Sequence, residues 1–183
     1  MIEKPITVSY LTTGPDYVDF KTAAAKAATR KYETNILRIT GCVLVFAALI
    51  LRAFFSGSFI QNVVYTVMAI VGVFVGAFYD SIVRCFIRKR AFNEYEANKK
   101  KFMAQTAEFD EEKITLKTDR YSAALPYGLF FRAYEDEKVF ILYTGMDEMR
   151  FIPKRAISEQ ECTQIQNILR TKLNEKYQQE GAR

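Results

Sequence analysis

Carboxylate side chains are the groups in this 183-residue chain whose type and spacing could support acid–base or metal chemistry, and they form runs at 110–112 and 135–137. The sequence contains no histidine, which excludes Ser-His-Asp and Cys-His triads and His-ligated zinc. Both runs lie beside segments with strand character, which favours a solvated linker at 110–112 and a hairpin tip at 135–137. The three cysteines, at positions 42, 85 and 162, lack metal-ligand spacing. We therefore expect no catalytic residues, no metal and no cofactor.

A basic pair, Lys154-Arg155, is the candidate binding contact. It lies in the segment 151–157 (Phe-Ile-Pro-Lys-Arg-Ala-Ile), directly after residues with strand character. The pair could contact a ligand or a protein partner. Alternatively, Pro153 ends the strand, because proline cannot donate to a strand ladder, and the two charges solvate the turn that follows.

Two apolar segments predict a transmembrane helical hairpin over residues 36–83. Residues 56–79 are 24 consecutive uncharged residues, enough for a helix to cross a hydrocarbon core of about 30 Å, and they predict a span over about 60–83. Residues 39–51 are 13 uncharged residues, and arginine side chains that reach the interface would extend this span to about 36–55. The alternatives are one span with an interfacial helix, or a hairpin buried in a soluble core.

Basic residues flank the hairpin and predict its orientation. Residues 84–101 carry seven basic and two acidic residues. Near the connection between the two spans, the only charged residue is Arg52. The positive-inside rule then predicts a protein of the cell membrane with both termini in the cytoplasm. A surface-lying basic set would be attracted to anionic lipid headgroups. This set comprises Arg84, Arg88, Lys89 and Arg90. A phosphoinositide or nucleic-acid site on the same helix is the alternative.

Three residues of the predicted second span have types that carry function in membranes. Gly72 and Gly76 form a GxxxG pattern, which permits close helix packing. The packing could lie within the hairpin, near Gly41, or between two copies of the chain. Asp80 would be costly in lipid and could be a functional carboxylate, but Arg84 one turn later favours an ion pair at the interface.

The segments around the hairpin predict the elements that position these residues. Residues 1–35 predict a strand at 5–12 followed by an amphipathic helix. Residues 84–107 contain no glycine or proline and predict a basic stalk helix that continues the second span. The strand at 5–12 could join the sheet of the C-terminal domain, which we state as a hypothesis.

Residues 108–177 predict a small antiparallel β domain closed by a C-terminal helix. Their pattern changes to period two, which predicts five successive strands. These strands are expected at 114–119, 121–127, 129–136, from 138 onward, and at 149–153. Ser158 and Glu161 form a capping box that begins the last helix, whose apolar stripe includes Ile165 and Leu169. Residues 178–183 are expected to fray. The fold class is therefore membrane α+β.

The layout and the segment 151–157 together resemble the YcxB-like family of bacterial membrane proteins. The strand at 138–143 and the capped helix after Ser158 also fit, whereas the tryptophan common near the third strand of the family is replaced by Tyr127, Leu129 and Phe130. The resemblance implies a PH-like cytoplasmic domain on a membrane hairpin. It implies no catalytic residues.

These features favour a non-enzymatic integral membrane protein whose cytoplasmic domain binds a protein, peptide or lipid at the inner membrane face. The expected partners are anionic lipids and a cytoplasmic protein, and a homo-oligomer is compatible with the pattern. Nucleic acid is not expected, because residues 102–183 carry 12 basic and 14 acidic residues. The alternative is an oligomeric transporter or channel subunit, since two spans per chain would need several copies to form a path.

Overall fold

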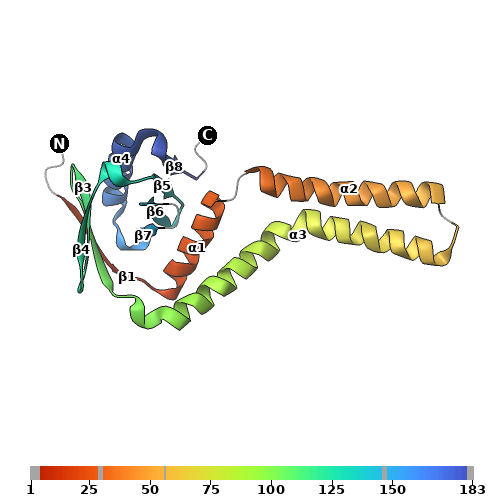
Figure 1. Cartoon of the computed structure of the whole chain (residues 1–183), viewed down its shortest axis with the longest axis horizontal. Coiled ribbons are helices and arrows are strands. Elements are labelled where there is room, and N and C mark those ends of the chain that lie inside the picture. The colour runs from red at the N-terminus through yellow and green to blue at the C-terminus, as the bar shows by residue number, and fades with distance from the viewer. Residues whose placement is uncertain (1–4, 29–30, 56, 146–147, 181–183) are drawn as a thin grey trace. The chain divides into compact units, whose positions relative to one another are not determined.

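A computed structural model describes residues 5–28, 31–55, 57–145 and 148–180 (Figure 1). Within these ranges the side chains of 31–38, 75, 79 and 80 are not described. The chain divides into two compact units, which we describe separately. The sheet unit comprises Met1–Ala25 and Arg88–Arg183, and the hairpin unit comprises Lys26–Ile87. The fold is α+β, with helices in the N-terminal half, two four-stranded sheets and a C-terminal helix.

The hairpin unit consists mainly of two helices, α2 (Lys31–Phe55) and the first part of α3 (Phe59–Asn98), which lie side by side (Figure 1). Among the described residues, Phe59–Phe78 is the one helical segment whose length and composition suit a membrane crossing, with a mean hydropathy of 1.9. Ile39–Phe55 is apolar but shorter. The second predicted span therefore meets the length requirement, and the first span stays a prediction.

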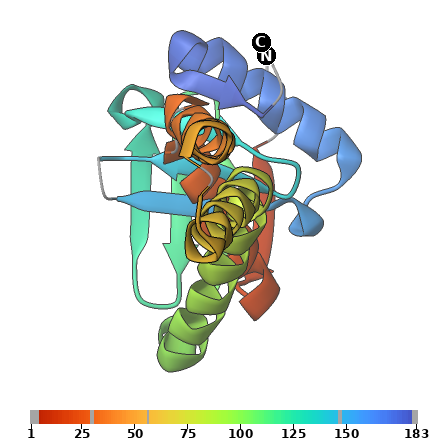
Figure 2. The same cartoon turned by 90° about the vertical axis from the view of Figure 1, so that its right-hand side faces the viewer.

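The sheet unit contains both sheets. The first has the order β1-β2-β3-β4, from β1 (Ile6–Leu11), β2 (Ala104–Phe109), β3 (Lys113–Thr118) and β4 (Ser122–Pro126), all antiparallel. The second has the order β7-β6-β5-β8, from β5 (Arg132–Glu135), β6 (Val139–Tyr143), β7 (Met149–Pro153) and β8 (Tyr177–Gln179). Only β8 is parallel to its neighbour. Figure 2 shows the strands of the two sheets crossing one another.

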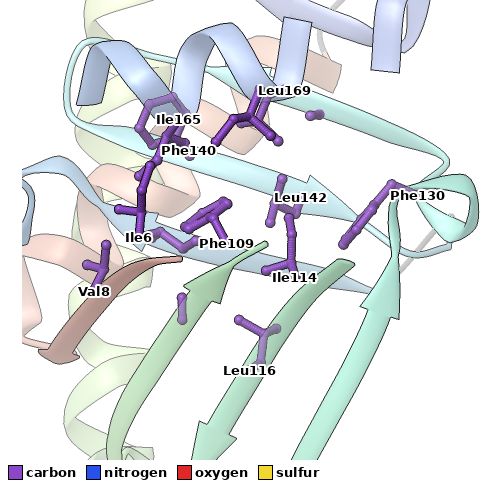
Figure 3. Packing of buried hydrophobic residues seen from close by; sticks show 14 of the residues in the cluster. Ile6, Val8, Phe109, Ile114, Leu116, Phe130, Phe140, Leu142, Ile165 and Leu169 are labelled. Carbon is purple, nitrogen blue, oxygen red and sulfur yellow. The ribbon is translucent and has the colours of Figure 1, made fainter. Parts of the chain in front are cut away.

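The core fills the space between the two sheets and under helix α4 (Glu159–Leu173) (Figure 3). Side chains from all three layers meet there. Each buried Leu, Ile or Phe side chain contributes about 1.5–3 kcal/mol relative to an exposed one. The central residues are Val8, Phe109, Ile114, Phe140, Leu142, Ile165 and Leu169.

The N-terminal strand joins the first sheet, as the sequence suggested it could. Strand β1 pairs with β2, and Leu11 lies opposite Ala104 at the end of the ladder. Helices α1 (Gly14–Ala28), α2 and α3 therefore all lie in the chain between two adjacent, paired strands. Everything that the sequence assigned to the membrane is inserted into a β1–β2 connection.

Two predicted boundaries are wrong. The stalk helix does not continue to 107: α3 ends at Asn98, the 3-10 helix η1 (Lys99–Lys101) follows, and 104–109 is strand β2. Ala, Gln and Glu favour helix in isolation, but pairing with β1 and β3 on both sides overrides that weak preference. The tail does not simply fray either, since 177–179 form β8 beside β5.

The capping box at the start of α4 is confirmed. The Ser158 side chain accepts from the Glu161 backbone N–H, and the Glu161 carboxylate accepts from the Ser158 backbone N–H at 3.0 Å. The apolar stripe of α4 is buried, including Ile165 and Leu169. The helix ends at Leu173, and the following Asn174, whose φ is 45°, reverses the chain into the 3-10 helix η4 (Asn174–Lys176) and then β8.

Candidate functional site

The Lys154-Arg155 pair lies on a one-turn 3-10 helix, η3 (Lys154–Ala156), between β7 and α4. Lys154 Nζ lies 2.5 Å from Glu135 Oε1 and 4.7 Å from the centre of the Phe140 ring. Its side chain is 16% exposed and that of Glu135 is 2% exposed. The Lys154 ammonium is therefore engaged inside the domain and does not simply solvate a turn.

Glu135 is the centre of a buried polar cluster at the junction of β5, α4 and β8. Its carboxylate accepts from Lys154 Nζ, from Gln166 Nε2 at 2.5 Å and from the Tyr177 hydroxyl. Burial, together with the bond to Glu135, raises the pKa of Tyr177, so this hydroxyl stays a donor at neutral pH. Three donors satisfy the charge of one carboxylate, which makes its burial tolerable.

The sequence prediction for this carboxylate is wrong. Residues 135–137 were expected at a solvated hairpin tip, but Glu135 and Asp136 are 2% and 7% exposed. The turn lies one residue later, where Asp136 N donates to Val139 O. Glu135 is buried because β8 and α4 cover β5 on the side that a two-stranded hairpin would leave open.

Arg155 connects the 3-10 helix η3 to the N-terminal helix α1. Its Nε and Nη2 each lie 2.6 Å from an oxygen of Asp16, and Nη2 also donates to Leu11 O at 2.9 Å. Asp16 is also held by Thr13, whose backbone N–H and hydroxyl donate to its carboxylate at 2.8 and 2.7 Å. Burial alone would raise the pKa of Asp16, but the bonds from Arg155 and Thr13 outweigh it and hold that pKa below its ordinary value.

The returning helix α3 is fixed to α1 by a second polar contact. The Tyr17 hydroxyl and Lys21 Nζ both donate to Glu94 Oε1, at 2.6 and 3.1 Å. The hydrogen bond from Tyr17, more than the nearby charge of Lys21, holds the pKa of Glu94 below its ordinary value. Around this contact Tyr17 lies 6.2 Å from Tyr95 and 5.2 Å from Phe102, measured between ring centres. These charged and aromatic contacts lie within the sheet unit and join α1 to the C-terminal part of α3.

The predicted membrane-surface residues lie on α3 beyond its apolar segment. Arg84, Arg88, Lys89 and Arg90 are all exposed. The side chain of Asp80 is not described, so its pairing with Arg84 stays a prediction. We call these four residues the basic collar.

The glycines of the predicted GxxxG pattern lie at a point where the backbones of α2 and α3 are in contact. A Cβ added at Gly41 would lie 2.7 Å from Gly72 O and 2.9 Å from Gly76 Cα. A Cβ added at Gly72 would lie 2.8 Å from Gly41 O. Backbone therefore packs on backbone at this point, which only glycine permits.

Gly72→Leu is expected to separate the two helices here and to destabilise the hairpin by about 1–3 kcal/mol, as overpacking typically does. Spin labels at positions 46 and 74, both exposed in the structure, measure the change as a longer or broader distance distribution in double electron–electron resonance. Gly57→Leu is the matched control, because its Cβ would meet only the flexible Gln61 side chain, at 3.9 Å. An unchanged distribution in Gly72→Leu would contradict the packing.

The side chains around Lys154 and Arg155 are suited to binding a partner and to stabilising the fold. Among the described residues, no group of three or more Cys, Asp or Glu side chains is arranged to hold a metal. Sequence reasoning missed Asp16, Glu94, Gln166 and Tyr177, each of which acts through a residue far away in the chain. Only Asp16 carried a local signal, since Thr13-Gly-Pro-Asp marks a helix start.

Comparison with known proteins gives one match. Residues 109–169 match the model of a family described as YcxB-like protein. The matched segment runs from the end of β2 to the last third of α4, and includes Glu135, Lys154 and Arg155. No curated protein and no solved structure matches the chain.

Proposed function

Taking as premise that residues 109–169 form a YcxB-like domain, we propose that the chain is a non-enzymatic membrane-anchored binding protein. Its sheet unit is a PH-like domain that binds a protein, peptide or lipid at the cytoplasmic face of the cell membrane. Two sheets, in which β1 to β4 and β5 to β7 are successive antiparallel neighbours, and helix α4 after β7 support the PH-like assignment. The helical hairpin inserted between β1 and β2 is the anchor.

The pairing of β1 with β2 is the observation that carries this proposal. Leu11 and Ala104 lie opposite each other, one just before and one just after the inserted helices. Two paired strands must lie on the same side of a membrane, so the chain between them crosses an even number of times. If Phe59–Phe78 crosses, α2 must cross as well. At 1.5 Å per residue the apolar part of α2 is about 25 Å long, which suits a span whose end Arg52 reaches the interface.

The basic collar supports the cytoplasmic placement of the sheet unit. It follows the apolar part of α3, and its four side chains are exposed. Each basic residue near an anionic surface contributes about 1 kcal/mol of attraction. We therefore propose that the collar lies against anionic headgroups and holds the domain at the membrane surface.

Replacing the collar arginines and lysine by glutamine is expected to abolish this contact. Exposed Cys85 lies within the collar region and provides a site for a spin label once Cys42 and Cys162 are replaced. In nanodiscs of phosphatidylglycerol, the label should be less accessible to a water-soluble nickel chelate than in nanodiscs of phosphatidylcholine. The four-glutamine variant should lose that difference.

A variant with Arg120→Gln and Lys172→Gln, two exposed residues elsewhere, is the control and should retain the difference. Equal accessibility of the unmodified collar in both lipids would refute the proposed contact.

A further inference from the structure

Three of the four outer edges of the two sheets are covered or short. The edge of β1 receives Arg155, whose Nη2 donates to Leu11 O. Strand β7 contacts α1, where Phe20 stacks on Phe151 with ring centres 4.5 Å apart. Strand β8 has three residues. Strand β4 is the exception: it has five residues, and among the described strands only β3 pairs with it.

The backbone groups that β4 presents outward follow from the bonds at its two ends. On the side facing β3, Tyr121 O accepts from Thr118 N at 2.8 Å, and Tyr127 N donates to Glu112 O at 3.3 Å. Successive residues of a strand direct their N–H and C=O groups to opposite sides. The odd-numbered residues of this segment therefore face β3.

The outward residues are Ser122, Ala124 and Pro126. Ser122 and Ala124 each offer an N–H and a C=O, whereas Pro126 offers only its C=O. Proline is tolerated in a strand where its nitrogen faces away from the sheet, which agrees with this assignment. The free edge thus presents two donors and three acceptors.

The composition of this edge gives little protection against pairing, because Pro126 removes only one donor, at the end of the strand. Proteins usually guard a free edge with lysine or other charges, but residues 121–131 are all uncharged. Ser122 and Ala124 are small and exposed. Apolar side chains lie exposed beyond both ends of the strand, with Tyr121 46% and Leu129 60% exposed.

We propose that β4 pairs antiparallel with β4 of a second copy of this chain, about a two-fold axis at Ala124. This register overlaps all five residues of the strand. The two Ala124 residues bond each other through both N–H groups, and each Ser122 N–H donates to Pro126 O of the other copy. In this register Tyr121, just before β4 in one copy, lies opposite Tyr127, just after β4 in the other copy and two residues before Leu129. A symmetric contact of this kind is closed, so it gives a dimer.

The register predicts that residue 124 faces itself, which a charge exchange tests. Ala124→Lys places two lysines opposite each other, and Ala124→Glu places two glutamates there; like charges directly opposite destabilise a strand pair. Each variant alone should weaken the dimer about tenfold or more, whereas an equal mixture of the two should pair again. Ala124→Pro removes both central donors and should weaken the dimer by a similar factor without touching the bonds to β3.

The measurement uses the full chain in detergent micelles and in nanodiscs, with mass by native mass spectrometry and pairing by energy transfer between labelled copies. Gln164→Lys adds the same charge on the exposed face of α4 and should leave the dimer unchanged. A monomeric wild type, or dimers that persist in all three Ala124 variants, would overturn the proposal. Failure of the Lys and Glu variants to pair when mixed would overturn the register. This outcome does not depend on the anchoring role, which rests on the hairpin and the collar.

Discussion

Lys154→Met is expected to destabilise the sheet unit by about 3–5 kcal/mol, because it leaves the buried carboxylate of Glu135 without its counter-charge. The methionine keeps the length and the apolar stem of lysine, so the packing on Phe140 is largely retained. The loss therefore reports on the charge. Gln166 and Tyr177 still donate to the carboxylate, and neither neutralises it.

Adding Glu135→Gln to Lys154→Met is expected to restore most of the stability, since the buried charge is then removed together with its partner. Lys138→Met is the matched control. It breaks a lysine–carboxylate ion pair with Asp19 at 3.1 Å in which 60% of the lysine side chain is exposed, so a loss below about 1 kcal/mol is expected. Pulse proteolysis of the full chain in urea measures all three variants. Similar losses in Lys154→Met and Lys138→Met would show that the buried cluster is not important for stability.

Arg155→Ala is expected to weaken the attachment of α1 to the sheet unit by about 2 kcal/mol, because Asp16 loses two charge-assisted hydrogen bonds and keeps only those from Thr13. Arg155 is half exposed, which limits the effect relative to Lys154. Hydrogen exchange of the α1 amides in the full chain measures the loss. Thr163→Ala, on the exposed face of α4, is the control.

This contact also predicts a pH dependence. The pKa of Asp16 is lowered in the folded state, so its contribution to stability is present above the unfolded pKa of about 4 and is lost as the pH falls through the folded pKa. The difference between wild type and Arg155→Ala should therefore be full at neutral pH and shrink in acid. A difference that is constant from pH 7 to pH 3 would contradict the assigned role of Asp16.

Residue spacing within a single segment was enough to predict several features of the fold. The capping box at Ser158, the stripe through Ile165, the period-two strands and the close approach at Gly72 all follow from spacing within one segment. The segment 151–157 also contributed to the resemblance to the family whose model matches residues 109–169.

Long-range contacts were not predictable in the same way. Strand β2 has a helix-favouring composition and becomes a strand only between β1 and β3, the first of which lies about a hundred residues earlier in the chain. Glu135 looks solvated in sequence because Tyr177 and Gln166, which bury it, come from later elements. The role of Lys154 and Arg155 as a binding contact stays a prediction, and their partners Glu135 and Asp16 could not be inferred from spacing.

In the proposed topology a two-span hairpin is inserted between paired strands, so that the loop of the hairpin and the sheet unit lie on opposite sides of the membrane. Single cysteines at Ser58 in the loop and at Ser122 in the sheet unit, in a chain lacking Cys42, Cys85 and Cys162, test it directly. In intact cells a membrane-impermeant thiol reagent should label Ser58→Cys at once and Ser122→Cys only after the membrane is permeabilised. Labelling of both positions, or of neither, in intact cells would contradict the account.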